Sequence, residues 1–254
     1  MSPRIEIEPL GDLPEVAEGD SVGALIAAAA NRAGLALADD DAIVVSQKIV
    51  SKAEGRVRRL AAVAPGAEAA AMAAELDRDP RLLELVLNES RRIVRATPGV
   101  LIAETNSGWV CANAGIDASN MDEGLVALLP ADPDASARRI RAELDAATGV
   151  RPAVVVADSF GRPWRVGQCD VAIGCAGLVA VDDWRGRADT RGRELTATVI
   201  AVADQLAAAA DLARDKTSGA PAALVRGAAS WRTDDDGPGA AATLQRAAEL
   251  DLFR

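Results

Sequence analysis

The hydrophobic pattern in the first half of the chain predicts strands that alternate with helices. The segment IEIEP, residues 5–9, alternates apolar and acidic positions as a half-buried strand does. Residues 24–33 are apolar at helical spacing, and the acidic run at 39–41 precedes an apolar string at 42–45 that is typical of a buried strand. The elements expected beyond it are helices at 66–76 and 80–90 and short strands at 91–96, 99–104 and 108–113.

The second half opens with a loop around GIDASN, residues 115–120. An amphipathic helix follows, which Asp132 or Asp134 can cap and which ends at Gly149. A further apolar strand at 153–157 ends in the segment DSFGRPWR. The remaining elements expected are closely packed strands at 171–181, a long Ala-rich helix at 195–212, a strand at 221–227, a solvated loop at 234–239 and a last short helix.

These elements predict a mixed α and β fold, and 254 residues suffice for one large domain or two small ones. No internal repeat or low-complexity linker is found. The composition then narrows the chemistry, because the chain contains no histidine. Catalytic triads that use histidine, histidine proton shuttles and histidine-ligated zinc are therefore excluded.

Charge and cysteine content set further limits. The formal net charge of -10 disfavours broad binding to nucleic acid. Three cysteines without a CxxC pair fit neither a disulfide framework nor a zinc knuckle, so we expect core thiols in a reducing compartment. The start of the chain has no apolar signal core and no apolar run is long enough for a membrane span, which favours a cytoplasmic protein.

Two acidic segments are candidates for a metal site. Asp158 and Ser159 follow the apolar strand at 153–157, and Asp117 with Asn120 lies in the Gly-opened loop. Carboxylate and hydroxyl oxygens suit a hard divalent ion that clamps phosphate oxygens. Local turn capping explains either aspartate equally well, and the arginines that follow Ser159 are equally consistent with a solvated surface.

Two cationic segments are candidates for a polyphosphate site. Lys48 and Lys52 lie in SQKIVSK, and Arg214 and Lys216 lie in RDKTSG, in each case beside small polar residues. Neither segment is a Walker loop or a dinucleotide fingerprint, and charge runs of this kind are most often solvated faces.

Several long and unusual segments occur in a fixed order over nearly the whole chain. They are LPEV with EGD after it, VVSQKIVSKAEGR, NAGIDASN, LLPADPDASA, VVVADSFGRPWRVGQCDVAIGCAG, DDWRGRADTRGREL, VADQLAAAADL, PAALVRG and DLFR. With these segments the chain resembles the coenzyme F420-0 gamma-glutamyl ligase family.

The resemblance implies a ligase that attaches L-glutamate to the lactyl carboxylate of F420-0, a deazaflavin precursor, with GTP as phosphoryl donor and an acyl phosphate as intermediate. It implies Mg²⁺ or Mn²⁺ at one or two positions, with K⁺ as a further candidate ion. The implied fold is a two-lobed α+β structure in an intertwined homodimer, with no nucleic-acid or membrane partner. We expect residues 1–254 to form a single ligase domain without the flavin reductase domain that follows in many bacterial relatives.

The resemblance also implies roles for individual residues. Asp117 and Asp158 match the metal-binding aspartates on which catalysis depends, and Ser159 matches a neighbouring hydroxyl ligand. Asn120 matches a GTP contact and Lys52 a lysine that binds GTP phosphate. The other matched positions lie in three loops expected to contact the nucleotide: Leu13, Pro14, Glu15 and Val16; Gln47 and Lys48; and Arg214, Asp215, Lys216, Thr217, Ser218, Gly219 and Ala220.

Two positions depart from the family pattern. Lys216 lies near the position of an acidic second-metal ligand, so either other groups hold that metal or the lysine partly replaces its charge. Gln47 replaces a small hydroxyl residue, which leaves the choice of nucleotide open. Two alternatives therefore stand beside the ligase: a nucleotide-binding paralogue without catalysis, and a ligase for a different acceptor.

Overall fold

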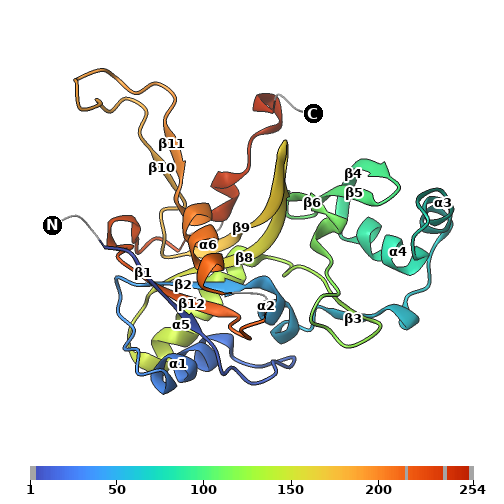
Figure 1. Ribbon diagram of the computed structural model, residues 1–254, viewed down its shortest axis with the longest axis horizontal. Helices are drawn as coiled ribbons and strands as arrows, with labels where there is room; N and C mark the ends of the chain where they lie inside the picture. The colour runs from blue at the N-terminus through green and yellow to red at the C-terminus, as the bar shows by residue number, and fades with distance from the viewer. Residues whose placement is uncertain (1–3, 215–216, 237–238, 252–254) are drawn as a thin grey trace.

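The computed structural model describes residues 4–214, 217–236 and 239–251, and these form mixed α and β structure as the sequence predicts (Figure 1). The α-helices are α1 (Val22–Arg32), α2 (Gln47–Ala53), α3 (Ala67–Leu76), α4 (Pro80–Asn88), α5 (Pro133–Thr148) and α6 (Val202–Ala213). The strands are β1 (Glu6–Leu10), β2 (Ala42–Ser46), β3 (Val57–Arg59), β4 (Ser90–Thr97), β5 (Val100–Thr105), β6 (Val110–Ala112), β7 (Leu125–Ala127), β8 (Ala153–Arg162), β9 (Arg165–Ala176), β10 (Val181–Asp183), β11 (Val199–Ala201) and β12 (Ala222–Arg226).

The centre of the molecule is a five-stranded sheet in the order β1-β12-β2-β8-β9. Strands β2 and β8 are parallel, with Ala42 opposite Ala153 and Ser46 opposite Ala157, and the other pairs are antiparallel. Because β2 and β8 run in the same direction, the residues that follow Ser46 and Ala157 meet at one edge of the sheet.

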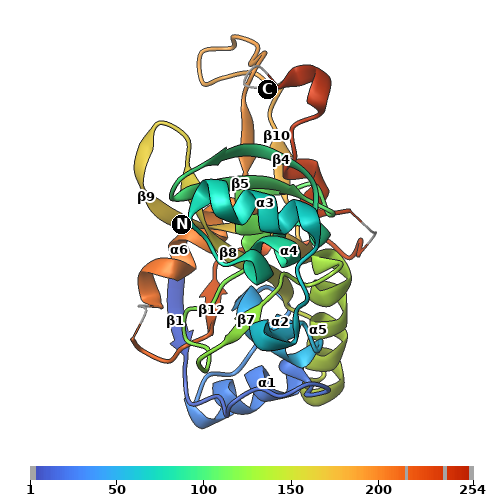
Figure 2. The same cartoon turned by 90° about the vertical axis from the view of Figure 1, so that its right-hand side faces the viewer.

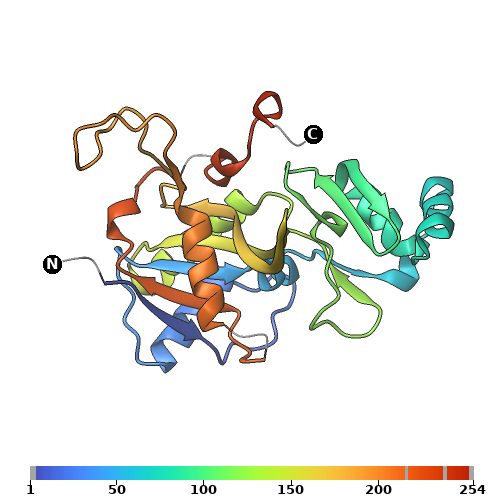
Figure 3. The same ribbon diagram turned by 45° about the horizontal axis from the view of Figure 1, so that its top comes forward.

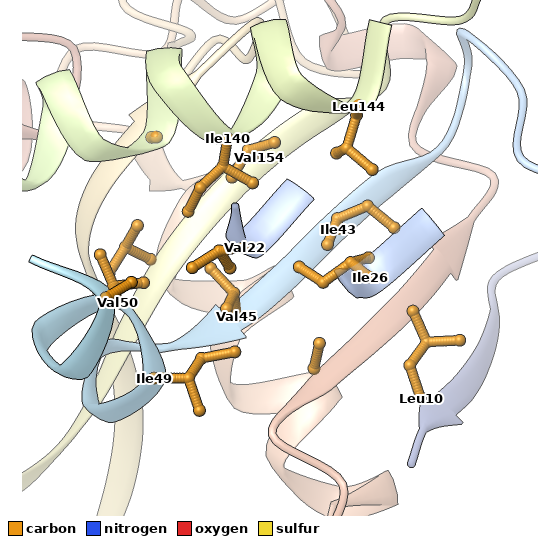
Figure 4. Packing of buried hydrophobic residues seen from close by; sticks show 14 of the residues in the cluster. Leu10, Val22, Ile26, Ile43, Val45, Ile49, Val50, Ile140, Leu144 and Val154 are labelled. Carbon is orange, nitrogen blue, oxygen red and sulfur yellow. The ribbon is translucent and has the colours of Figure 1, made fainter. Parts of the chain in front are cut away.

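Helices cover both faces of this sheet. Alternate residues of β8 point to opposite faces, so Val154 and Val156 pack with Ile140 of α5 in one cluster of buried side chains, which Figure 4 shows in part. Val155 and Ala157 pack on the other face with α6, which crosses the sheet in Figure 3. Burial of each such valine or isoleucine contributes roughly 1.5–3 kcal/mol.

A smaller second group of elements lies beside the central sheet. It consists of the sheet β4-β5-β6 with α3 and α4 packed against it, and the β3–β7 ribbon (Figure 2). Leu83, Val86 and Leu101 belong to its separate hydrophobic cluster. This group carries the loop that leads to Asp117, so the two parts of the molecule contribute different candidate residues.

Local signals place most element ends. Asp132, one of the two predicted caps, accepts a hydrogen bond from the Ala135 amide at 2.9 Å, and α5 ends at Gly149 with a φ of 75°. Asp134 is instead buried and accepts a hydrogen bond from the Cys175 amide at 2.8 Å. The helix therefore begins and ends where the sequence predicts.

Three predicted boundaries are wrong. The strand expected from residue 171 begins already at Arg165, where β9 starts to pair with the end of β8. Strand β8 does not end at Ala157 but continues to Arg162, because β9 pairs with it along this length and the chain reverses at Trp164, whose φ is 58°. The Ala-rich helix expected from residue 195 begins only at Val202, because residues 199–201 pair with β10. In each case pairing with another strand determines the boundary, which local patterning does not reveal.

The acidic run at 234–236 is not simply solvated. Asp236 forms an ion pair with the fully buried Arg141, and Arg151 donates to it at 3.0 Å. Residues 237 and 238 of the predicted loop lie outside the described residues. The run therefore anchors the C-terminal part of the chain to α5.

Strands β10 and β11 form a separate two-stranded ribbon, and the loop between them projects away from the central sheet (Figures 1 and 3). Trp184 at its base stacks under the Arg187 guanidinium, 5.1 Å from the ring centre. In the part of the chain that the structure covers, none of the helices combines the length and apolar character of a membrane span.

Candidate functional site

The candidate site lies at the edge of the central sheet where β2 ends at Ser46, beside Ala157 of β8. The hydroxyl of Ser46 accepts a hydrogen bond from the Lys48 amide at 3.4 Å and caps α2, which carries both Lys48 and Lys52. The predicted cationic segment is thus a short helix whose lysines are held at this edge. Most of the residues predicted for the site gather around it.

Lys48 joins the helix to the loop of Asp117. Its ammonium lies 2.8 Å from Asp117 Oδ2 and also donates to the Ser119 hydroxyl at 2.8 Å. Ser119 in turn donates to Asp117 from its amide at 2.8 Å and from its hydroxyl at 2.6 Å. Burial raises the pKa of Asp117, but the hydrogen bonds from Lys48 and Ser119 outweigh it, so that the pKa is lowered overall. Asp117 is therefore an anion that needs a cation beside it.

Asp158 has the opposite electrostatic state. Burial, together with the negative charges of Asp170 and Asp117, raises its pKa to about 7, although the Ser159 amide and Lys48 act against this. No lysine or arginine of the described residues forms an ion pair with its carboxylate. A half-buried carboxylate among like charges is poised to accept a cation.

Ser159 does not share the face of Asp158. Because side chains alternate along β8, Asp158 shares the face of Val156, on the side of α2 and α5. Ser159 shares the face of Ala157, on the side of α6. Its hydroxyl donates to Asp170 Oδ1 at 2.5 Å, across the β8–β9 pair. The predicted hydroxyl ligand is thus engaged on the opposite side of the sheet from Asp158.

Asp170 also pairs with Arg214. The Nη2 atom of Arg214 lies 2.7 Å from Asp170 Oδ2, and the two side chains are only 5% and 8% exposed. Arg214, expected to contact the nucleotide, therefore directs its guanidinium into the protein. Asp170 is not among the residues predicted for the site. The acid directly before the apolar run VAIGCA was a detectable signal, because a buried carboxylate requires a partner.

A cavity of about 510 Å³ adjoins the lysine helix. Glu15, Lys52 and Asn120, all predicted nucleotide contacts, line it together with Glu18 and Asp122. The Lys52 ammonium lies 2.5 Å from the carboxylate of Glu15, whose side chain is 83% exposed. The cavity therefore brings together residues from three segments that are far apart in sequence.

Three neighbours of Glu15 differ in their placement. Pro14 is exposed, whereas Leu13 packs partly against the core and Val16 is buried, so these two apolar residues anchor the loop. Val16 also lines the cavity. Gln47 is 2% exposed, and its side-chain oxygen accepts a hydrogen bond from Ser51 at 2.8 Å. The Gln47 side chain is thus held inside the protein and does not line the cavity.

The last predicted loop is described from Thr217 onward, and Asp215 and Lys216 lie outside the described residues. Thr217, Ser218 and Gly219 are exposed, and Ala220 is half-buried. The loop leads to Pro221, whose carbonyl accepts a hydrogen bond from the Ser46 amide at 2.8 Å. It therefore lies at the same sheet edge as the lysine helix.

The donor set fits a hard divalent ion in part. Asp117 and Asp158 supply carboxylate oxygens, the donors that Mg²⁺ and Mn²⁺ prefer. Among the described residues, no group of three or more acids or cysteines is close enough to hold a metal by itself. An ion at the two aspartates would therefore need water or substrate oxygens as well, which is usual for Mg²⁺.

The cysteines are free thiols. Cys111 and Cys175 are buried, and burial together with nearby aspartates raises the pKa of each to about 12. Cys169 is half-buried in β9. Buried thiols with so high a pKa are poor nucleophiles at neutral pH, which agrees with the expectation that Cys111 and Cys175 are core thiols.

Comparison with known proteins finds similarity over nearly the whole chain. A family model described as F420-0:Gamma-glutamyl ligase matches residues 11–227. A coenzyme F420:L-glutamate ligase of Methanothermobacter thermautotrophicus is 44% identical over 95% of this chain and 96% of its own length. Proteins of the same name from Methanopyrus kandleri and Archaeoglobus fulgidus are each 39% identical over 99% of this chain and 98% and 97% of their own lengths.

Proposed function

The chain belongs to the F420-0:gamma-glutamyl ligase family, and we propose that it joins L-glutamate to the lactyl carboxylate of coenzyme F420-0 with GTP and a divalent metal. The observation that carries this proposal is the meeting of Lys48, Asp117 and Asp158 beside the cavity lined by Lys52 and Asn120. Cations for phosphate and carboxylates for a metal are the groups that phosphoryl transfer needs.

Asp117 and Asp158 would hold the metal. Mg²⁺ or Mn²⁺ bound there would neutralise the negative charge that develops on the transferring phosphoryl group. Lys48, at present paired with Asp117, would then turn to phosphate oxygens, because the ion replaces its charge on the carboxylate. The two aspartates and the lysine thus act as one electrostatic unit.

Lys52 and the cavity would bind the nucleotide. The Lys52 ammonium is held by the exposed Glu15, which a phosphate group can displace without exposing buried surface. Asn120 offers an amide that can both donate and accept hydrogen bonds. The exposed hydroxyls of Thr217 and Ser218 at the neighbouring loop are further contacts for phosphate.

The proposed reaction has two steps. An oxygen of the lactyl carboxylate attacks the γ-phosphorus of GTP, the bond to the bridging oxygen breaks, and GDP leaves. The amine of L-glutamate then attacks the carbonyl carbon of the acyl phosphate, phosphate leaves with the bonding electrons, and the amine nitrogen loses a proton. Neither step needs a histidine, which agrees with the absence of histidine from the chain.

Release of phosphate from GTP tests the proposal when each substrate is omitted in turn. The ligase requires that release depend on F420-0, on L-glutamate and on Mn²⁺ or Mg²⁺. GTP binding without any glutamate-dependent release would instead favour the paralogue without catalysis. Release that follows only when another carboxylate replaces F420-0 would favour a different acceptor.

A further inference from the structure

A buried chain of hydrogen bonds runs along the sheet edge, and Asp170 lies at its centre. One carboxylate oxygen accepts from the Ser159 hydroxyl at 2.5 Å, and the other accepts from Arg214 Nη2 at 2.7 Å. Both oxygens of Asp170 are therefore engaged, with partners from two different segments. Because the Asp170 and Arg214 side chains are almost fully buried, solvent does not loosen this arrangement.

The chain continues beyond Arg214 to the lysine helix. Arg214 Nη1 donates to the carbonyl of Pro221 at 3.3 Å, and the same carbonyl accepts from the Ser46 amide at 2.8 Å. Ser46 caps α2, which carries Lys48. A single network thus connects the strand of Asp158, the segment before β12 and the helix of the lysines.

A buried ion pair of this kind is not explained by stability alone. Desolvation of two charges offsets most of their attraction, and apolar residues of similar size would hold the strands together at least as well. What the pair provides is direction, because the planar guanidinium and the carboxylate each hold two partners at fixed angles. Asp170 therefore fixes the orientation of Ser159 and of the Pro221 carbonyl.

Resting on the proposed function, we propose that Asp170 is a positioning residue for the metal site. Through Ser159 it holds β8 so that Asp158 presents its carboxylate on the opposite face of the sheet. Through Arg214 it holds the Pro221 segment against the same edge. On this account Ser159 supports Asp158 from behind through its bond to Asp170.

Binding of Mn²⁺ alone to the full chain, measured by calorimetry, tests this role without any reaction. Asp170→Asn and Ser159→Ala are each expected to weaken Mn²⁺ binding about 10- to 100-fold, the usual cost of losing a group that orients a ligand. The double variant is expected to bind no more weakly than the weaker single variant, because both changes remove the same bond.

Asp236→Asn is the matched control. It breaks a second arginine–aspartate pair, with the buried Arg141, in a part of the chain that lies outside the proposed site. We expect it to lower the melting temperature as Asp170→Asn does, while Mn²⁺ affinity stays within about twofold of wild type. Equal losses of affinity in both variants would reduce Asp170 to a general structural role and overturn the proposal.

Other outcomes also decide the matter. A folded Asp170→Asn variant with wild-type Mn²⁺ affinity would overturn the role of Asp170 and leave the proposed function standing. The same holds if adding Ser159→Ala to Asp170→Asn weakens Mn²⁺ binding further, since the Ser159 hydroxyl would then act independently of Asp170. If Asp170→Asn does not fold, Asp170→Glu serves instead, because it keeps the charge beside Arg214 but moves the carboxylate away from the Ser159 hydroxyl. Unchanged Mn²⁺ affinity in Asp170→Glu would also contradict the role of Asp170. Wild-type protein that binds no Mn²⁺ overturns the proposed function, and this inference with it.

Discussion

Under the proposed function, single charged residues of the site exchange partners when substrates bind. Lys48 and Lys52 are paired with Asp117 and Glu15, the acids nearest to them. Burial, together with the like charges of Asp170 and Asp117, raises the pKa of Asp158 to about 7. Metal on the aspartates and phosphate on the lysines would satisfy all of these groups at once.

Replacement of Asp158 by Asn is expected to reduce phosphate release on the order of a thousandfold, because about 4 kcal/mol of charge stabilisation depends on the metal. Its effect on stability should have the opposite sign. A folded-state pKa raised from 3.8 to about 7 means that the stability contributed by Asp158 is present below about pH 4 and lost as the pH rises through about 7.

Urea unfolding in the presence of a chelator, at about pH 5 and pH 8, measures this effect. Wild-type protein should lose on the order of 2 kcal/mol more than Asp158→Asn between the two conditions, after allowance for solvent screening. Other titrating acids contribute equally to both proteins and cancel in the difference. Equal losses of unfolding free energy in the two proteins would show that folding does not raise the pKa of Asp158.

Lys52 and Glu15 offer a pair of opposite predictions. Lys52→Gln is expected to weaken GTP binding about 10- to 100-fold, since a hydrogen bond to a charged group contributes roughly 1.5–3 kcal/mol. Glu15→Gln removes the acid that competes for the ammonium and should leave GTP binding unchanged or tighter. Fluorescence titration with a GTP analogue checks both, and a weaker Glu15→Gln variant would mean that Glu15 contacts the nucleotide directly.

Motifs predict Asp117, Asp158 and Lys48 because each follows a strand or opens a loop. The partners of these residues are harder to predict. Arg214 and Asp170 are 44 positions apart, and only the three-dimensional fold shows that they form an ion pair. The separation of Ser159 from Asp158 follows from the alternation of β8, which local patterning predicts to end one residue before Asp158.

At the scale of elements, capping decides where the site helix begins. Strand β2 ends at Ser46, whose hydroxyl and amide respectively cap α2 and hold the Pro221 segment. Asp132 caps α5 in the same manner, but α5 packs on the sheet as part of the scaffold. The Ser46 cap therefore affects a helix that carries site residues, whereas the Asp132 cap affects only a helix of the scaffold.

Ser46→Ala and Asp132→Ala are each expected to lower the free energy of unfolding by about 1 kcal/mol. Only Ser46→Ala should also raise the KM for GTP, because α2 carries both lysines. Chemical unfolding and steady-state kinetics on the same preparations check the pair. An unchanged KM in Ser46→Ala would show that the lysines do not depend on this cap.

The sequence predicts helices with strong local signals and less reliably predicts the extent of strands. Helix α5 has an acidic cap, an amphipathic body and a glycine end, so its limits can be predicted. Strand β11 has only three residues, and without knowledge of β10 the apolar stretch reads as the start of α6. Strand length depends on a partner, whereas helix length depends mainly on local hydrogen bonds.

In the molecule as a whole, the loop between β10 and β11 is the segment that projects furthest from the central sheet (Figure 1). Val181 and Ile200 at its base pack against the α6 cluster, whereas Val199 is exposed. We propose that a second copy of the chain covers this loop in the homodimer that the family resemblance implies.

We expect the wild-type chain to be a dimer in light scattering coupled to gel filtration. Replacement of residues 185–197 by a short glycine turn should shift the protein to a monomer, because the projecting part of the ribbon is lost. Asp132→Ala, which lies in the scaffold, serves as a control for general destabilisation. A wild-type monomer at micromolar concentration would contradict this prediction.

The central claim is that this chain forms an amide bond between L-glutamate and F420-0. Mass analysis of the deazaflavin product, after incubation with GTP, Mn²⁺ and L-glutamate, tests it most directly. We expect a product heavier by one or more glutamyl residues, formed only when GTP and metal are both present and lost in Asp158→Asn. F420-0 recovered at unchanged mass, from protein that binds GTP and Mn²⁺, would contradict it.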